Sequence, residues 1–360
     1  MRKIILNIYI WLWKYIKTRL SRFVPAHINN PFKLMRRMLI SGNKAAWFTL
    51  WLTGLGVILS PIDWALQFFD HKTRPRRRSC ASGGPYIFIC GPARSGTTLV
   101  FQVLSSTLEI AYPRNFTAMF SRSPLLAMRL FSRDQRNNRN TSYQNYYGKT
   151  VGLQGPSEAN HLWNQWVDSD ISGFRTQLHT KGAEEMASFF EILSQQTGLP
   201  TLAKNNNINA FANAIASRLD NSYFICLRRD SRFLAQSLVK AREEINGDML
   251  QSYGVTNTAT WNLKSDPLDQ VVSQIEYMES LAIKQQQEIG EDRFWIVEYE
   301  AFCANPEVLV NRVRRQILQK SPEEDRNVSY EIPTITNSNR VSDLSLLREL
   351  EERLGRSRAI

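Results

Sequence analysis

Short apolar runs that end in polar or glycine-rich turns divide residues 80–360 into the strands and helices of an α/β protein. The run 86–90 (YIFIC) has no charged residue and the length of a buried strand, and an apolar-periodic helix follows it from Thr97 onwards. Residues 221–227 are a second strand of this buried type, and 201–204 form a shorter one that ends in a lysine. The pattern predicts strand–loop–helix units, with binding residues placed just after the strands.

Residues 1–79 follow another pattern, in which apolar and aromatic residues are interleaved with basic ones. Residues 1–44 contain ten Lys or Arg and no acid, a combination typical of amphipathic helices that lie in a membrane interface. Residues 45–62 then carry no charge over 18 positions, which is the lower limit for a membrane-spanning helix. The N-terminal region is therefore expected to be helical and to associate with a membrane surface.

Basic residues stand on both sides of this apolar segment, whereas spanning segments usually have positive charge mainly on one side. Gly54, Gly56 and Ser60-Pro61 can bend the chain. We expect a re-entrant or monotopic hairpin with both ends on the cytoplasmic face, and the alternatives are a true span and a helical cap on the globular domain. The basic run 74–78 then marks the membrane boundary, and 71–84 is the linker.

The distribution of charge separates the same two parts of the chain. The net charge is +12, but residues 1–79 hold 15 Lys or Arg and only two acids, Asp63 and Asp70, whereas residues 80–360 hold 30 bases and 31 acids. The second part is neutral, so we expect no nucleic-acid partner. We predict a membrane-associating region at 1–79 and a catalytic domain at 80–360. No cluster of Cys, His or Asp has metal-ligand spacing, and no metal is expected.

The turn after the first strand, GPARSGTT at 91–98, has the sequence of a phosphate-binding loop. Such a loop directs backbone N–H groups and the positive end of the helix dipole at an anion. Gly91 and Gly96 have the spacing of the GxxxxGK[ST] loop of nucleotide triphosphatases, but Thr97 replaces the lysine, and the cation is Arg94. An arginine contacts pairs of phosphate or sulfate oxygens without needing a metal ion.

With an arginine inside it, this loop resembles the 5′-phosphosulfate loop of sulfotransferases that use 3′-phosphoadenosine 5′-phosphosulfate (PAPS). The resemblance implies a P-loop-type three-layer α/β sandwich with a central parallel sheet, preceded here by the helical basic and apolar N-terminal extension. It also implies that the 5′ side of PAPS is held by Arg94, Ser95, Gly96, Thr97 and Thr98.

A second block, at the end of the strand 221–227, resembles the 3′-phosphate site of the same family. In that site an arginine at the strand end is followed eight positions later by a serine in the next helix, and Arg229 and Ser237 fit this spacing. Ser231 stands where the family usually has a proline. The placement is also reasonable chemically, because an arginine at the carboxyl end of a strand and a hydroxyl in the following helix can converge on one phosphate.

Further blocks extend the resemblance to roughly residues 86–345. Lys204 resembles the strand-end lysine that reaches the transferring sulfuryl group in tyrosylprotein and many bacterial sulfotransferases, where it would neutralise charge on the bridging oxygen. Residues 293–306 resemble the family's strand and "YEDL…P" segment. Arg340 lies in a C-terminal segment that, as in relatives, is expected to return to the 3′-phosphate.

Transfer to an alcohol also needs a general base for the acceptor's proton. In the resembling branch, a carboxylate near the acceptor comes from the region of LQGPSEANH, residues 153–161. Glu158 is our first candidate and His161 the second, and a residue not identified from the sequence is the remaining possibility. The alternative roles are a helix cap for Glu158 and a place on a helix surface or in the core for His161.

The sequence therefore predicts a membrane-associated sulfotransferase with its catalytic domain on the cytoplasmic side. It would move a sulfuryl group from PAPS to a hydroxyl or amine of an unknown acceptor, possibly a lipid or glycolipid, and release 3′-phosphoadenosine 5′-phosphate (PAP). Two alternatives from other classes are a P-loop kinase or NTPase, against which the missing loop lysine counts, and a catalytically silent membrane scaffold with the same fold.

Overall fold

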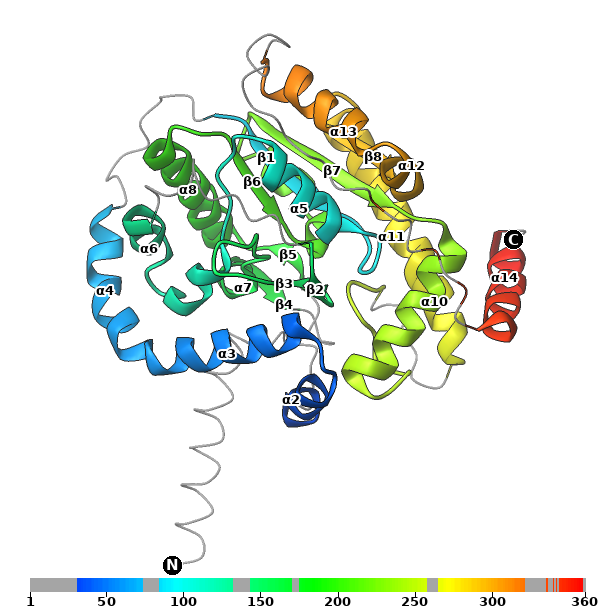
Figure 1. Ribbon diagram of the computed structural model, residues 1–360. Coiled ribbons are helices and arrows are strands. Elements are labelled where there is room, and N and C mark those ends of the chain that lie inside the picture. The colour runs from blue at the N-terminus through cyan, green and yellow to red at the C-terminus, as the bar shows by residue number, and fades with distance from the viewer. Residues whose placement is uncertain are drawn as a thin grey trace, which may run out of the picture.

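The apolar runs form one parallel sheet in the computed structural model (Figure 1). The strands are ordered β6 (Thr201–Lys204), β1 (Tyr86–Cys90), β7 (Ser222–Arg228) and β8 (Phe294–Glu298). Each neighbouring pair runs parallel. β1 is buried along its whole length, which explains why its sequence shows no alternation of polar and apolar residues.

Helices cover both faces of this sheet (Figure 1). One layer contains α7 (Asn160–Trp166), α8 (Thr180–Thr197), α9 (Ala212–Ala216) and α11 (Pro267–Ile289), and the other contains α5 (Thr97–Thr107), α12 (Tyr299–Ala304) and α13 (Pro306–Arg312). Phe88 and Cys90 lie in the core of the first layer, whereas Ile87 and Ile89 lie in the core of the second, because successive strand residues point to opposite faces. The predicted three-layer sandwich with a central parallel sheet is confirmed.

Shorter elements connect and extend these layers. The strands β2 (Asn145–Tyr146) and β3 (Lys149–Thr150) form an antiparallel pair, and so do β4 (Val167–Ser169) and β5 (Arg175–Leu178). The remaining helices are η1 (Asn115–Phe120), α6 (Pro124–Phe131), η3 (Asn206–Ala210), α10 (Ser231–Ala241), η4 (Arg242–Asn246), η5 (Val313–Ile317) and α14 (Leu344–Arg358). The structure describes residues 31–73, 84–131, 143–169, 175–257, 265–320, 335, 339, 341 and 343–358.

In the described part of the N-terminal region, three helices run along one side of the sandwich: α2 (Pro31–Ile40), α3 (Lys44–Ile58) and α4 (Ser60–Thr73) (Figure 1). α3 packs against η1 and against the β2–β3 hairpin, and α4 packs against α6. The chain bends by 70° between α3 and α4, at the Ser60-Pro61 position where the sequence predicts a bend. Among the described residues, no single helix is long and apolar enough to cross a membrane, and only this bent pair together meets those criteria.

Two buried carboxylates attach α4 to the sandwich. Asp63 accepts hydrogen bonds from the backbone N–H groups of Arg122 and Ser123 (3.0 Å each) and from the Ser123 hydroxyl (2.7 Å). Asp70 accepts one from the N–H of Leu126 (2.8 Å). All these donors lie at the start of α6, where helical N–H groups have no intrahelical acceptor. The only acids of the N-terminal region therefore bind the positive end of a helix in the sandwich.

The predicted boundary between regions 1–79 and 80–360 lies outside the described residues, as do residues 74–83 of the predicted linker. This division stays a prediction. The contacts of α3 and α4 with the sandwich show that at least one face of the N-terminal region is covered by protein.

Candidate active site

The loop between β1 and α5 has the conformation that an anion site needs. Gly96 has a φ of 96°, in the region that favours glycine, and a β-carbon at this position would overlap the ring of Tyr299. Thr97 and Thr98 begin α5, so their N–H groups belong to the helix end that lacks intrahelical acceptors. The loop therefore turns N–H donors and the helix dipole toward the space beyond the carboxyl ends of the strands.

Side chains of this loop connect it to the end of β6, the neighbouring strand. Thr97 Oγ1 donates to Asn206 Oδ1 (3.0 Å), and Lys204 Nζ donates to Thr98 Oγ1 (3.3 Å). Ser95 is fully buried within the loop. The structure thus brings the two threonines predicted to bind the donor next to the lysine predicted to act on the transferring group.

Lys204 also forms an ion pair with Glu158, the first candidate for the general base. Lys204 Nζ contacts Glu158 Oε1, and the lysine side chain is 2% exposed whereas the glutamate side chain is 18% exposed. Glu158 is therefore accessible to an incoming molecule, and the lysine is enclosed by protein. The alternative role of Glu158 as a helix cap is wrong, because α7 begins after Ala159 without a side-chain cap.

The carboxylate of Glu158 is surrounded by cations and donors. Asn160 Nδ2 donates to Glu158 Oε2 (3.1 Å), and a β-carbon on Gly148 would lie 2.9 Å from Glu158 Oε1. Burial by itself raises the pKa of Glu158, but the ammonium groups of Lys204 and Lys149 outweigh this and hold the pKa below its ordinary value. Glu158 is therefore ionised at neutral pH and able to take a proton.

His161, the second candidate for the base, is buried in the first turn of α7. Glu158, by contrast, contacts Lys204 directly beside the phosphate loop. The geometry favours Glu158 over His161, whose catalytic role stays a prediction.

The residues predicted to bind the 3′-phosphate lie next to the same loop. Ser237 is in α10 and accepts a hydrogen bond from Arg94 Nε (3.1 Å). Arg229 is 7% exposed, and its Nη1 donates to the carbonyl oxygen of Arg94 (2.8 Å). Arg94 is thus in contact with both members of the Arg229–Ser237 pair, and its assignment to the 5′ side of the donor stays a prediction. The Arg94 guanidinium also lies over the ring of Tyr147, 4.7 Å from its centre.

Arg229 is held in place by side chains from two other segments. Its Nε and Nη2 donate to Asn339 Oδ1 (2.9 and 2.7 Å), and its guanidinium lies 4.9 Å from the centre of the Tyr299 ring. Asn339 in turn donates to Glu300 Oε1 (2.7 Å). Burial lowers the pKa of Arg229, though an arginine stays charged at any physiological pH. Arg340 lies outside the described residues, and its contact with the 3′-phosphate stays a prediction.

The family model of the sulfotransferase family matches residues 85–317. This range contains the phosphate loop, Glu158, Lys204 and the Arg229–Ser237 pair. The chain belongs to the sulfotransferase family. Among curated proteins, none has a sequence that matches it significantly.

Solved structures of sulfotransferases are similar to this one at low sequence identity. The sulfotransferase STF1 from Mycobacterium tuberculosis H37Rv has 14% identity and a TM-score of 0.47, covering 85% of this chain and 84% of its own. STF9 from Mycobacterium avium has 13% identity and a TM-score of 0.45, with coverages of 77% and 69%. The sulfotransferase domain of the Synechococcus PCC 7002 olefin synthase has 15% identity and a TM-score of 0.37, with coverages of 80% and 98%.

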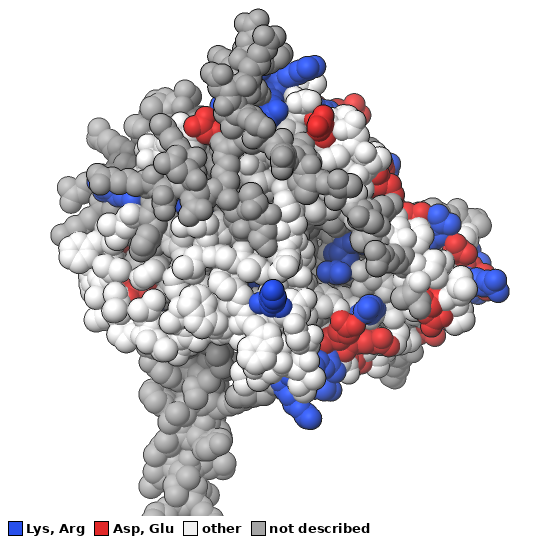
Figure 2. Space-filling model, viewed as in Figure 1, with Lys and Arg blue, Asp and Glu red and all other residues white. Residues whose placement is uncertain are grey.

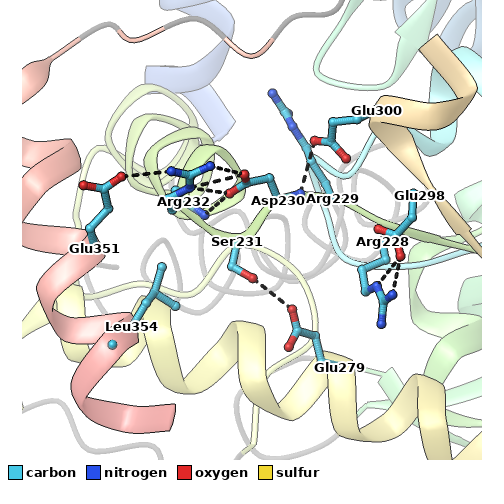
Figure 3. A pocket seen from close by; sticks show the side chains of 11 residues that line it. Arg228, Arg229, Asp230, Ser231, Arg232, Glu279, Glu298, Glu300, Glu351 and Leu354 are labelled. Atoms are coloured by element: carbon cyan, nitrogen blue, oxygen red, sulfur yellow. Dashed lines mark hydrogen bonds and ion pairs between the residues drawn. The ribbon is translucent and has the colours of Figure 1, made fainter. Parts of the chain in front are cut away.

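In this sulfotransferase Arg229 also lines a pocket of about 730 Å³, which is formed mainly by residues 228–232 and by Glu279, Glu298, Glu300 and Glu351 (Figure 3). Its polar side chains are already paired: Arg228 with Glu298, Ser231 with Glu279, and Arg232 with both Asp230 and Glu351. Because carboxylates make up so much of the lining, a phosphate would be repelled there. An anion site on the loop side of Arg229 stays a prediction.

Several residues that shape the sulfotransferase site are not evident from the sequence. Gly148 and Lys149 reach Glu158 from the β2–β3 hairpin, and Asn339 reaches Arg229 from the C-terminal segment. Tyr147 and Gly148 form the Gly-containing two-residue turn between β2 and β3, which is a hairpin signal in the sequence. The described residues contain no group of three or more His, Cys, Asp or Glu placed to hold a metal ion.

Proposed function

We propose that the chain transfers a sulfuryl group from PAPS to a hydroxyl or amine of an acceptor and releases PAP. The observation that carries the proposal is the convergence of Lys204, Glu158 and Thr98 beside the phosphate loop. Arg229 and Ser237 meet around Arg94 at the same loop. The site thus offers separate groups for the donor, for the transferring sulfuryl group and for the acceptor's proton.

The donor would be held by its two phosphate-bearing ends. The N–H groups at the start of α5 suit the 5′-phosphosulfate, as helix N-termini suit other phosphates. Arg229 offers a fixed guanidinium to the 3′-phosphate, and Ser237 adds a hydroxyl from α10. Asn339 and the Tyr299 ring hold this guanidinium before any ligand arrives, so little side-chain entropy is lost when the phosphate binds.

In the transfer step, the acceptor oxygen attacks sulfur in line with the oxygen that bridges sulfur and phosphorus. A new O–S bond forms, the bridging S–O bond breaks, and its electron pair stays on the phosphate of PAP. The acceptor's proton passes to the carboxylate of Glu158. Lys204 neutralises the charge that develops on the bridging oxygen.

Lys204 has two partners in this scheme and cannot serve both fully. Without the donor its ammonium pairs with Glu158. When it turns to the sulfuryl group, Glu158 loses part of the positive charge that lowers its pKa. The pKa of Glu158 then rises, and the carboxylate becomes a stronger base when the donor is in place.

We also propose that the enzyme is associated with a membrane through residues 1–79, with its catalytic domain on the cytoplasmic side. The basic and apolar composition of this region supports the proposal. A lipid or glycolipid hydroxyl is then the acceptor that the site would meet most often. Nucleic acid is not expected as a partner, because the domain itself is neutral.

The test is a screen with [³⁵S]PAPS, using a membrane lipid extract and a set of soluble alcohols, phenols and amines as acceptors. We expect label in a lipid fraction, released PAP, and no requirement for magnesium. Lys204→Ala should reduce the labelled product roughly 10²- to 10³-fold, while Lys240→Ala, which removes an exposed lysine of α10, should not. Magnesium-dependent ATP binding without any labelled product would instead identify a P-loop kinase or NTPase.

A further inference from the structure

We infer that α2, α3 and α4 form a rigid platform that enters one leaflet of a membrane and keeps the active site at the lipid surface. Part of this inference, the delivery of a lipid-borne acceptor, rests on the proposed sulfotransferase activity. The platform itself rests on exposure, charge and packing of the described residues.

The outer face of these helices is unusually apolar for a protein surface. Eleven of the 17 large apolar side chains that are exposed in the described residues lie on α2, α3 and α4. Among them Trp51 is 51% exposed, Trp64 57%, Phe68 62% and Ile58 72%. Figure 2 shows few charged side chains over α3 and α4, at the lower left of the view, and many over α10 and α14 at the right. A contiguous apolar area of this kind marks a contact surface.

The opposite face of the same helices is fixed to the domain. Asp63 and Asp70 bind the start of α6, and Ala45 and Ala46 of α3 are completely buried. Arg37 of α2 donates to the carbonyl oxygen of Glu243 (2.9 Å) and contacts that of Glu244. The apolar face therefore has a fixed orientation and is not a loose tether.

A lipid leaflet fits this face better than a protein partner does. Tryptophan is enriched at membrane interfaces, where its ring is apolar and its N–H is polar, and three exposed tryptophans lie here: Trp47, Trp51 and Trp64. Lys33, Arg36 and Lys44 are exposed at the α2 end, where they can meet anionic headgroups.

The hydroxyls of Thr49 and Thr53 donate to carbonyl oxygens four residues earlier, so α3 leaves no hydroxyl proton unpaired in an apolar medium.

The bend between α3 and α4 determines how the platform would lie. Two helices at 70° to each other, each with one exposed apolar side, cover an area without either crossing the bilayer. The pair can therefore rest in the plane of one leaflet, consistent with a monotopic attachment whose two ends stay on the same face.

The platform also lies close to the catalytic cluster of Lys204, Glu158 and Thr98, and the β2–β3 hairpin connects the two. α3 packs against β2 and β3, and the turn between these strands carries Gly148, next to Glu158. The hairpin is thus in contact with α3 and also borders the proposed base. If α3 rests on a leaflet, the acceptor side of the site faces the headgroup region, and the hydroxyl of a membrane lipid can reach Glu158 without leaving the bilayer.

The test is electron paramagnetic resonance on the full chain, which carries a nitroxide label and is bound to vesicles of phosphatidylcholine and phosphatidylserine. Labels are placed on Trp51→Cys and Phe68→Cys, with Cys80→Ser to remove the one cysteine outside the described residues; the other three are buried. The matched control is Val308→Cys on α13, which is 64% exposed. Oxygen and nickel accessibility then report the depth of each label.

We expect the labels at 51 and 68 to lie at similar, shallow depths, roughly 5–10 Å below the headgroups, and the label at 308 to stay in water. Labels at 51 and 68 that remain in water would overturn the inference, as would a steep increase in depth from one helix to the other. If labels on two copies of the chain show spin–spin coupling in the absence of vesicles, the apolar face binds a second copy of the chain and not a leaflet. Calorimetry of PAP with the same variants tests the nucleotide site separately from membrane binding, because neither labelled residue belongs to the proposed PAPS site.

Discussion

In the proposed mechanism, the reactivity of the site depends on one carboxylate beside two ammonium groups. Glu158 pairs with Lys204 and also lies in the field of Lys149, whose own pKa is lowered by burial and by the like charge of Lys204, although Glu158 opposes this shift. Both lysines favour the ionised carboxylate. A base that is already deprotonated at neutral pH can act over a wide pH range, and its strength depends on how many of these charges remain beside it.

Lys149→Met should shift the pH dependence of transfer. Removing this ammonium takes away one of the charges that lower the pKa of Glu158, so the pKa rises and the rate begins to fall at a higher pH as the solution is acidified. Lys149→Arg keeps the charge and should leave the acid limb nearly in place. The measurement is kcat against pH with the acceptor found in the screen. A reduced rate with an unmoved acid limb would mean that Lys149 has only a structural role.

Glu158→Gln and Lys204→Ala should damage turnover much more than donor binding. Loss of a general base lowers kcat roughly 10²- to 10⁴-fold, and loss of a charge-stabilising donor lowers it roughly 10²- to 10³-fold. PAP has no sulfuryl group, so its affinity should change little in either variant. Rates from single turnovers and Kd values for PAP measure the two effects separately. A Glu158→Gln enzyme with full activity would exclude this residue as the base.

At this scale the sequence predicts residues on strands better than residues on loops. Lys204 and Arg229 stand at strand ends, where the parallel sheet brings them to one edge. Lys149 and Asn339 come from a hairpin and a C-terminal segment, and only tertiary packing brings them to the site. The described residue of the C-terminal segment that contacts Arg229 is Asn339, and the contact of this segment with a 3′-phosphate stays a prediction.

Among the elements, α6 is capped at its N-terminus by a carboxylate from another helix, Asp63 of α4. Asp63 satisfies two backbone N–H groups and the hydroxyl of Ser123 while being buried itself. An acid at this position stands out in a region that is otherwise basic and apolar. Its role could be suspected from the sequence, because buried acids need partners, but the partner could not, since α6 lies about 60 residues further along the chain.

Asp63→Ala should lower the free energy of unfolding by roughly 1–3 kcal/mol, because buried donors lose their acceptor. Urea denaturation followed by circular dichroism measures the change. Asp63→Asn, which keeps one acceptor oxygen, should cost less than the alanine variant. Equal stability of the wild type and Asp63→Ala would show that this contact does not hold α4 to the sandwich.

The strands and the helices that follow them are predicted well from the sequence, and the N-terminal helices less so. The apolar runs at 86–90 and 221–227 match β1 and β7 within one residue, because burial on both faces leaves a clear signal. For residues 45–62 the sequence leaves hairpin, span and cap open. The structure shows a bent pair that is packed on one face and exposed on the other, a combination that no single periodicity describes.

Over the whole molecule, the apolar platform and the residues proposed to bind the donor both border the catalytic cluster. Arg229 and Ser237 contact Arg94 of the phosphate loop, and α3 packs against the hairpin whose Gly148 lies next to Glu158. In the proposed mechanism, a donor from water and an acceptor from a membrane meet at Glu158 and Lys204. This arrangement depends on the chain having a nucleotide site at all, which is the central claim.

Isothermal titration calorimetry with PAP tests that claim most directly. The wild type should bind PAP, and Arg229→Ala should bind it roughly 10- to 100-fold more weakly, because a buried, charge-assisted contact with the phosphate is lost. Arg228→Ala is the matched control, since this neighbouring arginine is half exposed and paired with Glu298, and its affinity should equal that of the wild type. No PAP binding by the wild type, or equal affinity in the wild type and Arg229→Ala, would contradict the account.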